Sequence, residues 1–482
     1  MDTLHIASEL APIAKIGGLG DVTLGLPLEL ARSGFDVAVL IPKYDVIDTK
    51  PLKGLKKETS FSAIFEKKIY RNTLWSATFE GLKIFLIEER SHRRFFRRGA
   101  IYGTKDDSKR FLYFNACALE VLKLLNPKTV HLHDWHTGLI AALCPKDMRS
   151  VLTIHNPAYQ GIISLKELKT FPIRSIPKVW KTGRSHVSLL RAGIDSADYV
   201  TTVSPQFAKE MRSKKDPWGL YSLLKEKKRR FKGILNGIDY MIWDPAADPY
   251  IKAKAPASRV KKAASRALNN FIKAKKTNKR DLQKSLKLQV NPNLPVVACI
   301  TRLVEQKGLH LIEHAIRYTV EKGGQFVLLG SRASKKTLAT FKKLKKRLAP
   351  SHQAYLQFHH SEQLAHKIFA GSDLFIIPSL FEPCGITQMI AMRFGTIPLA
   401  RKTGGLADSV IDLKDTTHTP KKRNGFIFEK PSPESLEKAL DRAFDLWKKR
   451  PTKWNALINN ALSSSFDWRL SAVEYLKLYK LK

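Results

Sequence analysis

Short β-rich runs alternate with amphipathic helical segments in two separate series along this chain of 482 residues, which restricts its fold more than any other feature. Strands separated by helices are typical of right-handed βαβ units and a parallel sheet. The predicted strands of the first series are 4–8, 36–41, 83–87, 129–133, 151–155 and 199–203. Those of the second series are 296–301, 325–329, 355–358, 374–378, 396–400 and 425–428. We therefore predict an α/β protein with two doubly wound, Rossmann-like domains that face each other across a deep cleft.

The length and the cysteine content agree with this organisation. A chain of 482 residues exceeds what one hydrophobic core usually holds, and 43% of apolar residues excludes a largely disordered protein. The four cysteines have no paired spacing, which favours a reducing compartment over a disulfide framework or a zinc ribbon. No basic segment followed by an apolar core opens the chain, and no run is long enough to span a bilayer. We expect a soluble, cytoplasmic protein.

The charge is strongly positive. Eighty-four Lys and Arg against forty-three Asp and Glu leave a net charge of +41, which attracts polyanions. Because the basic residues are spread along the chain, solvated helix faces are the favoured interpretation, and nucleic-acid or acidic-surface binding is the alternative. Residues 252–287 hold thirteen basic residues and one acidic residue, Asp281. We expect a solvated helix or a partly ordered loop there, with a polyanion-binding arm as the alternative.

A glycine-rich loop follows the first predicted strand, in the order Lys15-Ile16-Gly17-Gly18-Leu19. Glycine allows a backbone to approach an anion closely, and a helix N-terminus offers unpaired N–H donors. Lys15 adds a mobile positive charge beside that loop. The pattern predicts a phosphate cradle at Gly17 and Gly18, although a tight turn that binds no ligand has the same composition.

Polar side chains end two further strands of the first series. His131, His133 and Asp134 lie at the end of strand 129–133, and alternation puts the two histidines on one face. The turn that follows need not bring His136 to them, and no cysteine cluster or spaced carboxylate pair accompanies them, so we expect no metal site. We expect Asp134 to point into the cleft and hold a polar ligand. His155, which ends the next strand, suits hydrogen bonds to hydroxyl groups or a purely structural role.

Comparable groups follow strands of the second series. Arg302 and Lys307 leave strand 296–301 together, which suits a clamp on a diphosphate. A strand end, a tight loop and a helix start follow at 378–388, where the backbone N–H groups of 385–387 can face an anion. Glu382 stands where a carboxylate would meet sugar hydroxyls. Cys384 has no base nearby in the sequence, which favours inert packing.

At these residues the chain resembles the bacterial glycogen synthase and plant starch synthase family. The motifs that carry the resemblance run from the first strand to the last helix and are Lys15-Ile16-Gly17-Gly18-Leu19, His131 to His136, His155-Asn156, Leu235-Asn236-Gly237, Arg302 with Lys307, Phe381 to Gln388 and Thr403-Gly404-Gly405-Leu406-Ala407-Asp408. Many related retaining glycosyltransferases have a second glutamate eight positions after the first. Here Ile390 stands eight positions after Glu382, which favours the glycogen synthase branch.

The resemblance implies the GT-B fold and a specific activity. Residues 1–240 would form an acceptor-side domain, 241–460 a domain that binds a nucleotide sugar, and 461–482 a helix that crosses back to the first domain. The enzyme would transfer glucose from ADP-glucose, with retention, to the 4-hydroxyl of an α-1,4-glucan, and so elongate glycogen. The resemblance implies no cofactor and no metal. Nucleic acid would bind non-specifically, if at all.

The resemblance also implies roles for individual residues. The expected catalytic residues are Asp134, His155, Arg302, Lys307 and Glu382. The expected substrate-binding residues are Lys15, Gly17, Gly18, Asn236, Cys384, Gly385, Ile386 and Thr387. Because no side chain is an evident covalent nucleophile, we expect front-face displacement, with the leaving phosphate accepting the proton of the acceptor.

Two departures from the family pattern concern the acceptor side and the basic segment. The family's Phe-Phe-Asp-Arg-Pro segment is matched here by Phe95-Phe96-Arg97-Arg98-Gly99, in a loop that tends to flank the acceptor. The basic segment at 252–280 is longer than its usual counterpart.

Two alternative functions stay open. A glucan phosphorylase shares the fold and carries a lysine-bound pyridoxal phosphate, whose lysine signature we do not find. A basic nucleic-acid- or surface-binding protein on a degenerate glycosyltransferase fold would account for the charge. Residues 252–287 contain Phe271 as their sole aromatic residue, which weakens stacking on bases.

Overall fold

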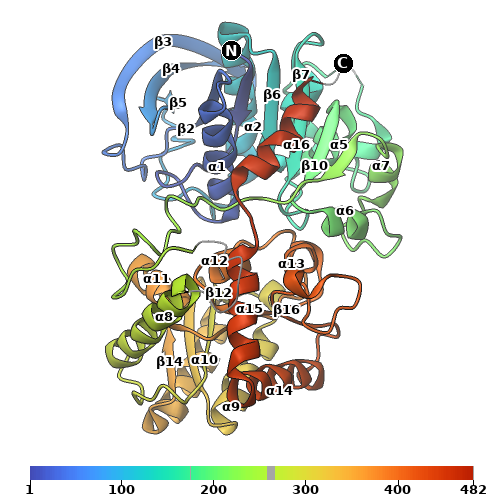
Figure 1. The fold of residues 1–482 in the computed structure, drawn as a ribbon. Coiled ribbons are helices and arrows are strands. Elements are labelled where there is room, and N and C mark those ends of the chain that lie inside the picture. Colours follow the sequence, from blue (N-terminus) through green and yellow to red (C-terminus); the bar gives the residue numbers. More distant parts are fainter. Residues whose placement is uncertain (174, 258–265, 481–482) are drawn as a thin grey trace. The chain divides into compact units, whose positions relative to one another are not determined.

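The chain forms two compact units in a computed structural model, which describes residues 1–173, 175–257 and 266–480 (Figure 1). The first unit consists of Met1–Gly237 together with Trp468–Lys482, and the second consists of Ile238–Asp467. Each unit is described by itself below. None of the helices in the described ranges is both long and apolar enough to cross a membrane.

A nine-stranded sheet in the order β11-β10-β7-β6-β1-β2-β5-β4-β3 forms the centre of the first unit. Its strands are Thr3–Ile6 (β1), Val37–Pro42 (β2), Lys53–Phe65 (β3), Lys68–Phe79 (β4), Leu82–Glu89 (β5), Thr129–His133 (β6), Arg149–Ile154 (β7), Tyr199–Thr202 (β10) and Phe231–Gly233 (β11). All neighbouring pairs are parallel except β3–β4 and β4–β5. Some of the parallel strands are continuous apolar runs, such as the fully buried β2, as is common where helices cover a sheet on both faces.

The six predicted strands of the first series are confirmed to within two residues at each end. The β3–β4 hairpin and β11 were not predicted. Strand β3 is a sheet edge, mostly exposed and rich in lysine, as edge strands commonly are. Its polar composition therefore hides the alternation on which a strand prediction depends.

Short connections and helices complete the first unit. The helices are Gly18–Arg32 (α1), Asp107–Leu125 (α2), Ile140–Leu143 (α3), Leu165–Leu168 (α4), Leu189–Ser196 (α5), Pro205–Met211 (α6), Tyr221–Glu226 (α7) and Trp468–Lys480 (α16), with 3₁₀ turns at Trp135–Thr137 and Lys178–Trp180 and a small antiparallel ribbon of Ile162–Ser164 (β8) and His186–Ser188 (β9). The chain's last helix, α16, lies beside α1 (Figure 1). A methyl group on Gly25 would lie 2.0 Å from the Trp468 indole nitrogen, so glycine is needed for this close approach.

A six-stranded parallel sheet in the order β14-β13-β12-β15-β16-β17 forms the centre of the second unit. Its strands are Val296–Arg302 (β12), Gln325–Ser331 (β13), Ala354–Gln357 (β14), Leu374–Ile377 (β15), Ile397–Arg401 (β16) and Phe426–Phe428 (β17). Its helices are Arg266–Ser285 (α8), Leu309–Glu321 (α9), Lys335–Leu348 (α10), Glu362–Gly371 (α11), Thr387–Arg393 (α12), Gly404–Ser409 (α13), Pro433–Lys449 (α14) and Pro451–Ser463 (α15), with 3₁₀ turns at Glu305–Lys307, Ala349–Ser351 and Pro420–Lys422. All six predicted strands are confirmed, again to within two residues.

The expectation of a solvated or partly ordered basic segment at 252–287 is wrong for the helix that it contains. Residues 258–265 of that segment lie outside the described ranges. Helix α8 buries one face, formed by Leu268, Phe271, Lys275, Asn278, Lys279, Leu282 and Gln283. Positions 268, 271, 275, 278 and 282 are three or four residues apart, and 279 and 283 adjoin the last two, so all of them line one side of the helix. Two lysines and two amides on that face concealed its apolar periodicity.

The ammonium groups of the two buried lysines of α8 both have polar partners. The Lys275 ammonium donates a hydrogen bond to the Thr396 hydroxyl at 2.6 Å, and burial lowers its pKa to about 7. The Lys279 ammonium lies 2.7 Å from a carboxylate oxygen of Asp373. A lysine stem is apolar, so it can cover a core while its head is paired. Helix α8 is therefore a part of the second unit's core.

Candidate active site

The glycine-rich loop between β1 and α1 is held from inside by Glu9. One Glu9 carboxylate oxygen accepts hydrogen bonds from the backbone N–H groups of Ile16 at 2.7 Å and Gly17 at 2.8 Å. The other accepts a hydrogen bond from the Tyr102 hydroxyl at 3.0 Å. The Gly17 N–H, which we expected to face a phosphate, is therefore engaged by a carboxylate in this structure. A methyl group added to Gly17 or Gly18 would meet nothing within 4 Å, so the outer side of the loop is open.

Lys15 lies at the same loop with its charge partly neutralised. Its ammonium is 2.7 Å from a carboxylate oxygen of Asp21, in the first turn of α1. Both side chains are partly exposed, and an ion pair of this kind contributes little stability. Lys15 is therefore able to exchange Asp21 for another anion at small energetic cost.

Asp134 follows β6 and secures the end of the neighbouring strand β7. One of its carboxylate oxygens accepts hydrogen bonds from the backbone N–H groups of His155 at 2.7 Å and Asn156 at 3.3 Å. Its backbone φ of +58° is unusual for a residue other than glycine and marks a strained turn, as occurs at functional sites. Burial raises the pKa of Asp134 to about 7. Asp134, at the end of β6, therefore fixes the backbone of His155, which follows the neighbouring strand β7.

As expected, His131 and His133 lie together and His136 lies apart from them. The rings of His131 and His133 stack with centroids 4.4 Å apart, whereas His136 lies against Tyr102 at 5.2 Å. His5, which the sequence analysis did not single out, joins the first two, and the ring nitrogens of the three lie within 4.8 Å of one another. A metal ion could bind to such a cluster, but the hydrogen bond between His5 Nδ1 and His133 Nε2 already engages these two nitrogens.

Asn236 follows β11 and is buried. Its side-chain oxygen has no hydrogen-bond partner among the residues that the structure describes. Buried acceptors are rarely left without a partner, so this oxygen is suited to a donor from a ligand.

Lys307 and Glu382 meet in the second unit. The Lys307 ammonium lies 2.6 Å from a Glu382 carboxylate oxygen, which also accepts a hydrogen bond from the Ser379 hydroxyl at 2.8 Å. The two chain segments approach closely because Gly308 has a φ of +71° and leaves no room for a side chain. A methyl group there would lie 2.3 Å from the Pro378 carbonyl oxygen. The structure thus joins two predicted catalytic residues that lie 75 positions apart.

Arg302 ends β12 and precedes the 3₁₀ turn that carries Lys307. Within the described ranges its guanidinium makes no side-chain hydrogen bond or ion pair, in contrast to the paired Lys307 ammonium. The planar guanidinium retains its fork of donors for a phosphate or carboxylate.

The loop after β15 lies close to the start of α13. The Gly405 N–H donates a hydrogen bond to the Glu382 carbonyl at 3.1 Å, and a methyl group on Gly405 would lie 2.2 Å from the Cys384 carbonyl oxygen. Cys384 itself is buried, in agreement with inert packing. Gly385 has a φ of +70°, and Ile386 and Thr387 begin α12. The loop is thus shaped by backbone approaches that side chains would block.

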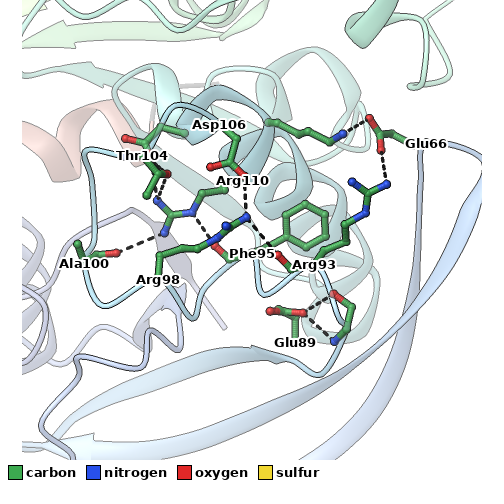
Figure 2. A network of polar contacts seen from close by, with 12 residues as sticks. Glu66, Glu89, Arg93, Phe95, Arg98, Ala100, Thr104, Asp106 and Arg110 are labelled. Atoms are coloured by element: carbon green, nitrogen blue, oxygen red, sulfur yellow. Dashed lines mark hydrogen bonds and ion pairs between the residues drawn. The ribbon is translucent and has the colours of Figure 1, made fainter.

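The loop that departs from the family pattern is organised around a buried arginine (Figure 2). Arg110, on α2, donates hydrogen bonds to the carbonyl oxygens of Phe95 at 2.6 Å, Ile101 at 3.3 Å and Ala100 at 3.4 Å. It also forms an ion pair with Asp107 at 2.6 Å. One side chain thus satisfies three carbonyls of the loop.

The unusual Arg97 has an acidic neighbour. Arg97 Nε lies 3.7 Å from a carboxylate oxygen of Glu89, whose side chain is inaccessible to solvent. Arg97 Nη2 donates a hydrogen bond to the Ser91 carbonyl at 2.9 Å. Glu89 lies at the end of β5, beside the loop (Figure 2). The arginine that replaces the family's aspartate therefore compensates a buried carboxylate.

The candidate residues fall into two groups, one in each unit. The first unit holds Lys15, Gly17, Gly18, Asp134, His155 and Asn236, and the second holds Arg302, Lys307, Glu382, Cys384, Gly385, Ile386 and Thr387. All lie at or beyond the carboxyl ends of strands or at helix starts, where open α/β sheets bind ligands. Sequence reasoning missed Glu9, although an acidic residue within a mostly apolar stretch is a signal, because a buried carboxylate needs partners.

Comparisons with known proteins agree with this geometry. Residues 2–226 match the starch synthase catalytic domain, and residues 279–461 match the glycosyl transferases group 1. The chain is 42% identical to a glycogen synthase of Protochlamydia amoebophila, over 100% of this chain and 99% of that protein. It is 41% identical to the solved catalytic domain of starch synthase IV from Arabidopsis thaliana, bound to ADP and acarbose, with a TM-score of 0.91 and coverage of 99% and 98%. A sucrose-phosphate synthase from Thermosynechococcus elongatus shares the fold at 15% identity, with a TM-score of 0.60.

One largely parallel and one wholly parallel sheet with polar strand ends, together with these structural neighbours, define a glycosyltransferase of the GT-B fold. The chain belongs to the glycogen and starch synthase family. The comparisons support a glycogen synthase and favour neither a glucan phosphorylase nor a nucleic-acid-binding protein.

The buried histidines of the first unit predict that acid destabilises it. Burial lowers the pKa of His5, His136 and His155 from 6.5 to about 3. It also lowers the pKa of His131 and His133 well below 6.5. Below pH 6.5 the unfolded chain binds more protons than the folded one, so the free energy of unfolding falls as the pH falls towards 3. Asp134 acts in the opposite sense, because its raised pKa gives stability below 3.8 that is lost as the pH rises through about 7.

Five histidines outweigh one aspartate, so we expect the urea midpoint of the first unit's unfolding to decrease from about pH 7 to about pH 5. Tryptophan fluorescence measures this midpoint. A midpoint that stays constant or rises over that interval would contradict the neutral, buried state of these rings.

Proposed function

We propose that this enzyme transfers glucose from ADP-glucose, with retention, to the 4-hydroxyl at the non-reducing end of an α-1,4-glucan, and so elongates glycogen. The observation that carries this proposal is the 41% identity, over 99% of the chain, to a starch synthase catalytic domain that is bound to ADP and acarbose. ADP is the leaving group of the proposed donor.

The second unit supplies the positive charge for departure of the diphosphate. Arg302 and Lys307 stabilise the negative charge that develops as the bond between the anomeric carbon and the diphosphate oxygen breaks. The Lys307 ammonium has three donors, so it can keep its contact with Glu382 while it binds a phosphate oxygen. Glu382, held by Lys307 and Ser379, directs its remaining acceptor sites to the 3- and 4-hydroxyls of glucose. The backbone of 384–387 and the side chain of Asn236 contribute further contacts to the donor.

The first unit orients the glucosyl ring. Asp134 holds the backbone of His155, whose carbonyl oxygen stabilises positive charge at the anomeric carbon. Lys15 exchanges Asp21 for a phosphate oxygen, beside the open side of Gly17 and Gly18. The acceptor 4-hydroxyl attacks from the face that the diphosphate leaves, and its proton passes to the leaving phosphate oxygen. No cofactor or metal takes part in this proposal.

The proposed domain roles follow the two units. The acceptor side belongs to 1–240, the nucleotide sugar to 241–460, and the crossing helix to 461–482, which the division at Gly237 and Trp468 supports. We propose a cytoplasmic location, in accord with four free cysteines, and only non-specific contact with nucleic acid.

A donor competition tests the function. Purified enzyme receives glycogen with ADP-glucose or UDP-glucose, and transfer of labelled glucose is measured with and without EDTA. We expect a higher kcat/KM for ADP-glucose, α-1,4-linked product and no effect of EDTA. Absence of glucan elongation with either donor would overturn the proposal, and a preference for UDP-glucose would overturn its donor assignment.

A further inference from the structure

Three histidines form a hydrogen-bonded chain that begins in the core of the first unit and ends at the proposed site. His5 Nδ1 lies 3.1 Å from His133 Nε2, and His133 Nδ1 lies 2.9 Å from His155 Nε2. The chain crosses the neighbouring strands β1 and β6 to the end of β7. Parallel register places His5 opposite His131, two positions before His133, so the rings share one face of the sheet.

Each ring in the chain is neutral near pH 7, because burial lowers the pKa of His5 and His155 to about 3 and lowers that of His133 as well. A neutral imidazole has one N–H donor and one acceptor nitrogen. His133 therefore donates to one neighbour and accepts from the other. Both hydrogen bonds are made only if all N–H groups point towards His155 or all point towards His5.

The two ends of the chain select one direction. His5 Nε2 is buried and has no hydrogen-bond partner among the described residues. If the N–H groups pointed towards His5, this atom would carry a buried hydrogen without a partner, and such orphaned donors are rare. In the opposite direction it is an acceptor, and the remaining N–H lies on Nδ1 of His155, a residue that keeps some exposure to solvent. Both ends favour N–H groups that point towards His155.

We infer that His133 and His5 are positioning residues that hold His155 in the tautomer with hydrogen on Nδ1, so that its side chain offers a donor to the substrate. The part that concerns the substrate rests on the proposed function. A donor at Nδ1 binds a hydroxyl or phosphate oxygen of the sugar nucleotide. It cannot accept the proton of the acceptor hydroxyl there, in accord with the proposed transfer of that proton to the leaving phosphate.

Nitrogen-15 NMR of the full-length protein with labelled histidine tests the tautomer directly. Long-range proton–nitrogen correlations distinguish a protonated from an unprotonated ring nitrogen, and His155→Gln identifies the His155 signals by their loss. We expect protonated Nδ1 and unprotonated Nε2 at His155 in the unmodified enzyme. Hydrogen on Nε2 would overturn the inference without any variant.

A pair of variants tests the cause. His133→Leu removes the donor to His155 Nε2, and we expect a mixture of His155 tautomers and a kcat about five- to tenfold lower, because a smaller fraction of molecules is competent. His131→Leu is the matched control, since His131 lies on the same strand and face, is equally buried and bonds Tyr479 and Thr153 instead. It should leave the His155 tautomer unchanged. An unchanged tautomer in His133→Leu would overturn the role of the chain.

The same spectra separate the other possibilities. Zn²⁺ added to the unmodified enzyme should leave the signals of His5 and His133 in place, whereas a shift of both would mean that a metal site replaces the hydrogen-bonded chain. The tautomer is measured without activity. A failed glucosyl-transfer assay with the expected tautomer would therefore overturn the proposed function alone.

Discussion

Replacement of Lys307 by methionine is expected to lower kcat for glucosyl transfer about 10²–10³-fold, the usual effect of removing one preorganised group that stabilises developing negative charge. The Lys307 ammonium is the group that the 2.6 Å contact with Glu382 holds at the proposed diphosphate position. Arg302 would remain, so residual transfer above the uncatalysed rate is expected. Donor turnover at saturating ADP-glucose measures the effect.

The same change leaves the largely buried carboxylate of Glu382 without its cation, which costs about 3–5 kcal/mol of stability. Lys279→Met is a matched control, because Lys279 forms a comparable buried pair with Asp373 at 2.7 Å within the same unit. Both variants should lose stability in urea, but only Lys307→Met should lose activity per folded molecule. Lys307→Met combined with Glu382→Gln should regain stability without regaining activity. Equal specific activity in the Lys307 and Lys279 variants would refute the phosphate clamp.

Replacement of Arg110 by methionine should cost about 3–5 kcal/mol of stability and release the loop at 95–104. Arg110 has 1% of its side-chain surface exposed, and it donates hydrogen bonds to the carbonyls of Phe95 and Ala100 (Figure 2) and of Ile101. Methionine fills a similar volume but leaves these oxygens buried without a donor. Urea unfolding measures the loss, and limited proteolysis locates the released loop.

Arg98→Met is the control for this loop. Arg98 forms an ion pair with Asp106 at 2.7 Å, but both side chains are about one-third exposed, and such pairs contribute about 0–1 kcal/mol. We expect near-normal stability and an intact loop. If both variants lose the same stability, the buried position of Arg110 is not what organises the loop.

Release of the loop should also weaken donor binding. Tyr102 belongs to this loop, and its hydroxyl contacts the Glu9 carboxylate that holds the backbone of Ile16 and Gly17. Loss of Arg110 is therefore expected to raise the KM for ADP-glucose as well as to lower stability. The loop that departs from the family pattern thus acts on the glycine-rich loop through two side chains.

Twelve strands of the two sheets were predictable because they are short β-rich runs, several of them wholly apolar, separated by helical segments, as in parallel sheets covered on both faces. The β3–β4 hairpin was not, since an edge strand keeps lysines on its exposed positions. The buried face of α8 was hidden for a related reason. Lys275 and Lys279 count as polar in a sequence, and their burial depends on acceptors such as Thr396 and Asp373, which lie about a hundred positions away.

Motif residues such as Lys307, Glu382, Asp134 and His155 were recognisable from the sequence alone, because each follows a predicted strand with a composition suited to anions or hydroxyls. Their partners were not. The position of Glu9 in a mostly apolar stretch signals a buried carboxylate but does not identify its partners, and His5 has no local signal. Their contacts arise only when the loop folds back on Glu9 and the sheet places β1 beside β6.

The sequence by itself determined the two α/β units, the order of their strands along the chain and the family, since these depend on local periodicity and on short motifs. Only the tertiary structure decided which carboxylate meets Lys307, which side chains hold the glycine-rich loop, and which way the histidine chain donates. These depend on distances between side chains remote in the sequence, and hydrogen bonds and ion pairs are effective only over a few ångströms.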